Sequence, residues 1–124
     1  MTDTAPRIRE LDLYRRYFDL VADERKTIEV RVRYPHLEDL AAGDVILFRV
    51  KGTDEACEVR VLRVTPYDGF EALLDGEGPG NINPAAGRGE QLANIREIYP
   101  PEKEKLGALA IEMELRDPAT APGD

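Results

Sequence analysis

The segment of residues 26–33 constrains the fold more than any other, because polar and apolar residues alternate along it. Successive side chains of an extended strand point to opposite faces, so Thr27, Glu29 and Arg31 are expected to share one face. The opposite face is expected to be apolar and consists of Ile28, Val30 and Val32. The segment therefore predicts a β-strand that buries one side and presents a carboxylate and a guanidinium on the other.

Two interpretations of this polar face are open. Lys26 at the start of the strand and Arg33 at its end add charge, which fits an exposed surface and a cleft equally well. It is either ordinary solvated surface, with a structural Glu29–Arg31 pair, or the floor of a polar cleft. The surroundings favour the cleft, since an amphipathic helical pattern precedes the strand and a Gly-Asp turn at residues 43–44 follows it.

The helical pattern before this strand follows a short predicted strand at residues 8–11. Its apolar residues recur at intervals of three and four: Leu13, Tyr14, Tyr17, Phe18 and Val21. Asp12 precedes them and is predicted to be the N-cap. An aromatic stripe with this spacing is typical of core packing, so Tyr14, Tyr17 and Phe18 are assigned to the core.

Three more strands are predicted, at residues 45–48, 56–65 and 108–115. Residues 51–54 have the composition of a hairpin turn between the first two of them. The alternation slips at residues 63–64, which predicts a bulge, and Pro66 is expected to end that strand because it lacks an amide donor.

Short helices are predicted from Asp68, as N-cap, to Gly76 and over residues 90–98, with one further turn at 102–106 and Gly107 after it. Residues 76–89 are rich in Gly, Pro and Asn and carry almost no large apolar side chain. Such a long connection is uncommon in a compact domain. It is interpreted either as a disordered surface loop or as a mobile cover over a binding cleft.

Five strands with short helices in irregular order do not fit a doubly wound parallel sheet, which needs regular alternation. The sequence instead predicts an α+β fold, with a small, curved mixed sheet or partly open barrel of about five strands and short helices at its rim. The 124 residues suffice for one domain. We expect a frayed N-terminus at 1–7, the domain at 8–115 and a disordered tail at 116–124.

The net charge of −8 argues against a protein that coats nucleic acid non-specifically. Residues 7–33 contain eight basic and six acidic residues, so the excess of acidic residues lies in the rest of the chain. A local basic cleft on an acidic body remains compatible with this distribution.

The chain has one cysteine, Cys57, and one histidine, His36, so neither an internal disulfide nor a zinc-ligand spacing is present. Cys57 lies among strand-forming residues and is predicted to be a buried, unreactive thiol. We expect no metal and no cofactor. No apolar run is long enough to span a bilayer and the first residues do not resemble a signal peptide, so a cytoplasmic protein without membrane contact is expected.

The order of these parts resembles the ASCH domain, a small member of the PUA-like superfamily. Its signature is Gly-x-Lys-x-x-Glu-x-Arg, then a loop, then Gly-Asp and an apolar strand; Lys26, Glu29 and Arg31 occupy the three charged positions here. Residues 17–20, 43–46 and 99–112 resemble the family's first helix, next strand and closing segment. The leading glycine of the signature is replaced by Glu24, so the turn before the strand is expected to form without a residue free to adopt positive φ.

The resemblance implies a PUA-like pseudo-barrel and an interaction with RNA, single-stranded nucleic acid or a modified nucleoside. It places Lys26, Glu29, Arg31 and Arg33 in a ligand-binding cleft. The two cations at the signature positions would contact phosphate or a base edge, and Glu29 would accept a hydrogen bond from an exocyclic amine such as that of cytosine.

An enzyme is the main alternative that the resemblance offers. Some small ASCH proteins are amidohydrolases that remove the acetyl group from N4-acetylcytidine with a threonine nucleophile and a lysine. Lys26 matches that lysine, but Glu29 stands where the threonine is expected, and Thr27 lies two residues earlier. The candidate catalytic residues are therefore Lys26, Thr27 and Glu29, with Glu29 as a general base for water. A non-catalytic interaction module with a structural Glu29–Arg31 pair is the third interpretation.

Overall fold

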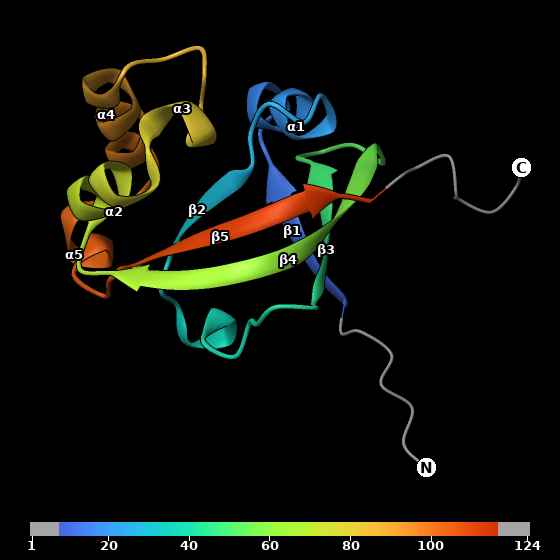
Figure 1. Cartoon of the computed structure of the whole chain (residues 1–124), viewed down its shortest axis with the longest axis horizontal. Helices are drawn as coiled ribbons and strands as arrows, with labels where there is room; N and C mark the ends of the chain where they lie inside the picture. Colours follow the sequence, from blue (N-terminus) through green and yellow to red (C-terminus); the bar gives the residue numbers. More distant parts are fainter. Residues whose placement is uncertain (1–7, 117–124) are drawn as a thin grey trace, which may run out of the picture.

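The computed structural model describes residues 8–116 and contains five strands: β1 (Ile8–Leu13), β2 (Ile28–Val32), β3 (Val45–Val50), β4 (Ala56–Tyr67) and β5 (Ala108–Leu115). They form one sheet in the order β1-β3-β4-β5-β2. β1 pairs with β3 in parallel, and the other three pairs are antiparallel. The sheet curls into a half-barrel (Figure 1). The α+β class and the curved mixed sheet are thus confirmed.

The helices are short: α1 (Arg15–Ala22), α2 (Phe70–Glu77), α3 (Pro79–Ile82), α4 (Arg88–Ile98) and α5 (Pro101–Glu104). Those from α2 to α5 gather on one side of the sheet (Figure 1). A single 3-10 turn, η1 (Pro35–Leu37), lies in the connection between β2 and β3. In Figure 1, α1 and the α3–α4 region lie near one another above the start of β2.

Both faces of the sheet are covered by apolar side chains, and β5 shows how. Leu109, Ile111 and Met113 belong to the core that includes Phe18 and Val21 of α1. The alternate residues Ala108 and Ala110 belong to a second core, which also contains Phe70, Leu73, Leu74 and Ile82 from α2 and α3. The small alanine side chains let α2 pack closely on the strand. β5 therefore buries alternate side chains in two different cores.

β4 is longer than predicted. The register shift between Val61 and Arg63 confirms the predicted irregularity. Pro66 does not end the strand, which continues to Tyr67. β3 pairs only with residues 56–60 of β4, so Pro66 lies where that side of β4 has no ladder partner and its missing amide costs no inter-strand hydrogen bond.

Both predicted N-caps are wrong. β1 stays extended to Leu13, which pairs with Val50, so α1 begins only after Tyr14 and Asp12 is a strand residue. α2 follows Gly69, and its first amide, that of Phe70, donates to Glu104 Oε2 at 3.1 Å instead of to Asp68. Sequence patterns identify local capping residues, whereas here a distant side chain serves one helix and strand pairing displaces the start of the other.

The segment of residues 76–89 is more structured than predicted. α2 continues through Gly76 and ends at Gly78, which has φ of 91°. A Cβ at position 76 would lie 2.5 Å from Tyr67 Oη, so glycine is needed there for packing and not to end the helix. α3 follows, and its Ile82 is buried in the second core. The segment is therefore not a structureless loop, and whether it moves stays a prediction.

The predicted ends of the domain fall almost wholly outside the described residues, at 1–7 and 117–124. Arg116 is described, and its amide donates to Glu58 O at 3.0 Å.

Cys57 is half-buried, and burial raises the pKa of its thiol to about 11. Among residues 8–116 there is no helix long and apolar enough to cross a membrane.

Candidate functional site

The polar face of β2 lies in the gap between the two edges of the half-barrel. β1 and β2 are the outermost strands of the sheet and are not paired with each other. Arg31 spans the gap: its Nη2 donates to the backbone carbonyl of Asp12 on β1 at 2.8 Å. A side chain thus joins the two edges where a closed barrel would have a backbone ladder.

Three charged side chains form a connected triad in this gap. Arg31 Nε lies 2.6 Å from Glu29 Oε2, and Lys26 Nζ lies 3.4 Å from Glu29 Oε1. The exposed fractions of the side chains are 4% for Lys26, 6% for Glu29 and 17% for Arg31. The polar face of the strand is therefore buried and internally paired, which excludes the interpretation as open solvated surface.

Lys26 contacts two backbone carbonyls and an aromatic ring in addition to Glu29. Its Nζ donates to Ile28 O at 2.8 Å and to Ile82 O of α3 at 3.2 Å, and it lies 5.7 Å from the centre of the Tyr17 ring. Burial lowers the pKa of Lys26, and the neighbouring Glu29 offsets part of that effect. This lysine ties β2 to α3 and has most of its donors occupied.

Glu29 is the acceptor at the centre of the triad. Burial by itself raises the pKa of Glu29, but Arg31 and Lys26 together outweigh burial and leave this pKa below its ordinary value. The carboxylate is therefore ionised at neutral pH. An ionised carboxylate accepts and does not donate, and its two oxygens have lone pairs beyond the two used here.

The turn that delivers Lys26 to the triad differs from the prediction. Glu24 itself has φ of 61°, the left-handed conformation that glycine adopts without steric cost. The amides of Arg25 and Lys26 both donate to Leu20 O, at 2.9 and 3.1 Å, and close the end of α1. The position of the signature's glycine thus takes the left-handed conformation here although the residue is a glutamate.

A pocket of about 110 Å³ adjoins the triad. It is lined by the end of β1 and the start of α1, by β2, and by α3 and α4. The lining residues are Asp12, Leu13, Tyr14, Tyr17, Lys26, Glu29, Val30, Arg31, Ile82, Asn83, Gln91, Asn94, Ile95, Ile98 and Tyr99. The pocket therefore combines the charged triad with aromatic rings and side-chain amides from segments far apart in sequence.

The aromatic stripe of α1 is divided between core and pocket. Phe18 is buried in the core as predicted. Tyr14 is 48% exposed and lines the pocket, so its assignment to the core is wrong. Tyr17 is half-buried, packs against the core and also lines the pocket. Tyr14 precedes α1 in an extended conformation, between the end of β1 and the helix, and therefore does not share the buried face of the helix.

Sequence reasoning missed the wall contributed by α4. Gln91, Asn94 and Tyr99 line the pocket, yet the sequence marks this segment only as an amphipathic helix. Gln91 is 2% exposed, which no periodicity argument predicts for a glutamine. The one signal in the sequence that could have indicated this wall is that polar residues interrupt the apolar spacing of the predicted helix at residues 90–98.

Two of the predicted site residues lie outside the pocket lining. Thr27 is exposed, and its backbone amide donates to Asn81 O at 2.9 Å. Arg33 is exposed near the turn that precedes β5, where its amide donates to Gly107 O at 2.9 Å. The structure therefore brings Lys26, Glu29 and Arg31 together and separates Thr27 and Arg33 from them.

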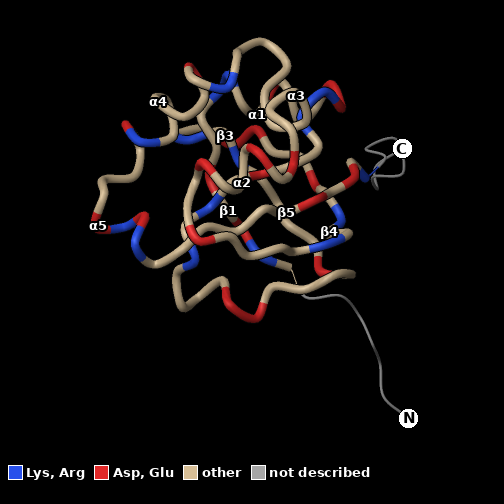
Figure 2. The backbone as a smooth tube through the Cα atoms, turned by 60° about the vertical axis from the view of Figure 1, so that its left-hand side comes forward, with Lys and Arg blue, Asp and Glu red and all other residues tan. Residues whose placement is uncertain are grey.

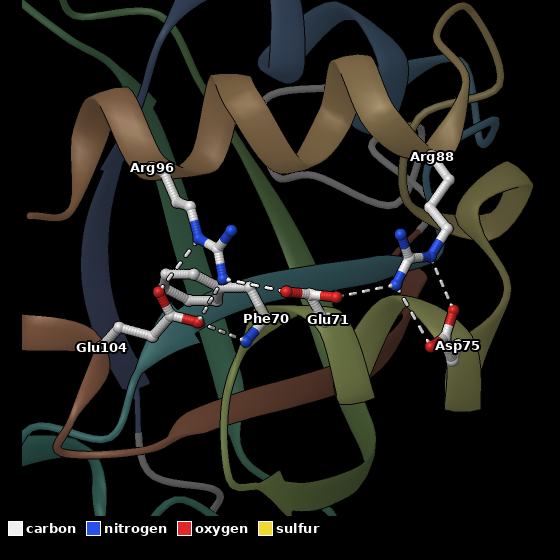
Figure 3. Close-up of polar contacts among 6 residues, drawn as sticks. All are labelled: Phe70, Glu71, Asp75, Arg88, Arg96 and Glu104. Carbon is white, nitrogen blue, oxygen red and sulfur yellow. Dashed lines mark hydrogen bonds and ion pairs between the residues drawn. The ribbon is translucent and has the colours of Figure 1, made fainter. Parts of the chain in front are cut away.

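An exposed chain of ion pairs holds α4 against its neighbours (Figure 3). Arg88 contacts Asp75 at 2.7 Å and Glu71 at 3.4 Å, both on α2. Arg96 contacts Glu71 at 3.5 Å and Glu104 of α5 at 3.1 Å. We call Asp75, Arg88, Glu71, Arg96 and Glu104 the α4 ion-pair chain. It fixes the outer side of the helix whose inner side lines the pocket.

Comparison with known proteins places these features in a family. The sequence model of the ASCH domain matches residues 11–117. The crystal structure of hypothetical protein PH0355 covers 88% of this chain and 99% of its own, with 30% identity and a TM-score of 0.80. The solution structure of protein PF0455 from Pyrococcus furiosus covers 89% and 98%, with 30% identity and a TM-score of 0.70.

More distant structures support the fold alone. The ASCH protein from Zymomonas mobilis has 15% identity and a TM-score of 0.63, and the match covers 90% of this chain and 68% of that one. A comparison with curated proteins found no significant match. The half-barrel is the PUA-like fold that the charged signature led us to expect, and the chain belongs to the ASCH domain family.

Proposed function

We propose that the pocket binds a single nucleobase, presented by a nucleoside or by a splayed base of single-stranded RNA. The observation that carries this proposal is the state of Arg31. Its Nε and Nη2 are held by Glu29 and Asp12, while Nη1 makes no hydrogen bond within residues 8–116. A guanidinium fixed by two of its nitrogens and 17% exposed at a pocket is preorganised to donate to a ligand.

The triad supplies both partners that the edge of a base requires. Arg31 donates, and the ionised Glu29 accepts from an exocyclic amine. The tyrosines at the pocket offer faces for stacking, which is how proteins commonly bind unstacked RNA bases. The triad itself carries two cations and one carboxylate, and Asp12 adds a second carboxylate at the pocket, so the site suits a base better than a phosphate.

Pocket size favours one ring over a larger group. A buried cavity of about 150 Å³ accommodates benzene. The volume of about 110 Å³ here is somewhat smaller and opens to the surface, so a six-membered pyrimidine ring fits better than a purine.

The charge distribution supports a pocket ligand over an extended nucleic-acid surface. The whole chain has a net charge of −8. Figure 2 shows Lys and Arg interspersed with Asp and Glu along the described backbone rather than gathered in one stripe. Without a continuous basic surface, binding depends on contacts to a base more than on counterion release.

The geometry does not favour the amidohydrolase alternative. Thr27 is exposed and absent from the pocket lining, and the aliphatic hydroxyl that an acyl transfer would use is missing there. Glu29 is engaged by both cations, which lowers its basicity toward water. Base binding therefore remains our proposal.

The proposal is tested by calorimetric titration of the purified protein with cytidine and with a short single-stranded oligocytidine. Tyr14→Ala and Arg31→Ala are expected to weaken binding at least about tenfold, because they remove a stacking face and a charged donor. Arg60→Ala is the control: Arg60 is exposed on β4, 3.9 Å from Glu114, and its loss should not change affinity.

Thermal unfolding of each variant shows whether it is folded before binding is compared. Tyr14 is 48% exposed and belongs to neither core, so its removal is not expected to disturb the fold. The absence of binding by the wild-type protein at millimolar ligand, or equal losses in the Tyr14 and Arg60 variants, would overturn the proposal.

A further inference from the structure

Gln91 is a buried side chain that the proposed base site has not used. It lies on α4, is 2% exposed and lines the pocket. Its Nε2 lies 2.8 Å from Pro79 O, 2.9 Å from Asn83 O and 2.9 Å from Ala86 O. A single side-chain amide thus holds residues 79–86, which we call the α3 segment, against α4.

These three carbonyls fix the orientation of the amide. The nitrogen of a glutamine side chain donates and its oxygen only accepts. A flipped amide would place Oε1 against three carbonyl oxygens, with no hydrogen between them. Gln91 is therefore constrained to direct its nitrogen at the α3 segment and its oxygen elsewhere.

The oxygen is the unusual part of this arrangement. Gln91 Oε1 is buried and has no hydrogen-bond partner within the described part of the chain, and it is the one side-chain atom there in this condition. Folded proteins leave few such groups, and those that remain call for an explanation. Since Nε2 is taken by three carbonyls, Oε1 is the polar atom of Gln91 that stays unsatisfied, on a residue that lines the pocket.

We propose that Gln91 Oε1 accepts a hydrogen bond from the ligand, which makes Gln91 a specificity-determining residue that selects bases carrying an exocyclic amine. This inference rests on the proposed function, because it assigns a role within the same pocket. It explains both why a glutamine is buried at a helix position and why its amide is held by three carbonyls.

The set of donors and acceptors at the pocket points to cytosine among the pyrimidines. Gln91 Oε1 and the ionised Glu29 are acceptors, while Arg31 is a donor. An exocyclic amine offers two N–H groups, and cytosine places its amine beside acceptors on the same edge. Uracil presents a carbonyl oxygen where cytosine has the amine, so it would direct an acceptor at an acceptor.

The test compares two ligands that differ by one amino group, across two proteins that differ at Gln91. The ligands are cytidine and the 2-pyrimidinone ribonucleoside, which has hydrogen in place of the 4-amino group. The proteins are the wild type and Gln91→Met, which keeps the length of the side chain and removes both polar atoms. Calorimetry or NMR titration gives the four dissociation constants.

We expect the wild type to bind cytidine at least about tenfold more tightly than the analogue, because the analogue leaves buried acceptors unpaired. In Gln91→Met the ratio of the two dissociation constants should fall at least about fivefold. The preference for cytidine that is left is attributed to Glu29, the other acceptor at the pocket. General loosening of the α3 segment weakens both ligands alike and cancels in the ratio.

Asn81→Ala is the matched control. Asn81 Nδ2 donates to Glu77 O at 2.8 Å, so its removal loosens the same segment without changing Gln91. This variant should retain the wild-type preference for cytidine.

The possible failures are distinguishable. If the wild type binds both nucleosides with equal affinity, the role of Gln91 is overturned while base binding stands. An unchanged preference in Gln91→Met also overturns it, because the amine is then recognised elsewhere. If the wild type binds neither nucleoside nor oligocytidine, the proposed function itself fails. The wild-type comparison needs no variant, so it remains decisive even if Gln91→Met does not fold.

Discussion

Two groups of ion pairs use the same kinds of side chain and differ in burial. The triad of Lys26, Glu29 and Arg31 has side chains between 4% and 17% exposed. In the α4 ion-pair chain, the exposed fraction is 19% for Glu104, 40% for Arg88, 43% for Arg96 and 63% for Asp75. The distances between charged atoms overlap in the two groups, so pairing geometry alone does not separate them.

The difference in burial separates their roles. Removing charges from water is costly, and a buried pair often stabilises a fold no more than apolar residues of similar size would. A buried triad beside a pocket is therefore better explained by what it presents to a ligand. The exposed chain costs little to form and contributes little individually, so its role is to position α4.

The largest difference is expected when the central carboxylate of each group is removed. Glu29→Ala leaves two buried cations without a counterion and should lower the free energy of unfolding by about 3–5 kcal/mol. Glu71→Ala, which removes the shared partner of Arg88 and Arg96, should have a much smaller effect. Urea unfolding of both variants measures this, and equal losses would show that burial does not distinguish the groups.

The response to acid should sharpen the same contrast. The pKa of Glu29 in the folded protein lies below its ordinary value of 4.5, which it regains on unfolding. Its contribution to stability is therefore complete above about pH 4.5 and is lost as pH falls through the lowered pKa. Urea unfolding from pH 6 to pH 2.5 should show a shallower decline for Glu29→Gln than for the wild type. If the free energy of unfolding fell equally with pH in both proteins, protonation of Glu29 would not be responsible for the loss of stability in acid.

A smaller effect is expected from cutting the α4 ion-pair chain. The double variant Arg88→Ala, Arg96→Ala removes the four contacts that tie α4 to α2 and α5 (Figure 3). Backbone amides of α4 should exchange faster with solvent, and affinity for cytidine should fall only a few-fold, to the extent that the pocket wall becomes mobile. Arg60→Ala serves again as the control. Unchanged exchange in α4 would mean that apolar packing alone holds the helix.

The dependence of RNA binding on salt is expected to be shallow compared with that of an extended basic surface. Lys26 and Arg31 are the cations that line the pocket, so a ligand should engage about one to three phosphates. The log–log dependence of affinity for single-stranded RNA on salt should then have a slope of roughly −0.7 to −2. Titrations of oligocytidine from 50 to 500 mM salt measure it. A much steeper slope would indicate that exposed arginines, and not the buried triad, provide the contact.

The local pattern of the sequence determined much of the fold. Alternation along residues 26–33 and 108–115 predicted two strands and placed Glu29 and Arg31 on one face, and both strands and the shared face are present. The slip near Arg63 predicted the irregularity in β4. These predictions succeed because the direction of a side chain in a strand depends on its neighbours in sequence.

Tertiary structure alone decided what each face meets. Lys26 donates to Ile82 O, 56 residues away, and Arg31 reaches Asp12 O across the open seam of the half-barrel. The exposure of Tyr14 and the burial of Gln91 also depend on which segments close over the gap. Periodicity specifies the direction of a side chain but not the partner that packs against it. The sequence therefore determined that Glu29 and Arg31 lie together, and only the fold decided that they lie buried beside a pocket.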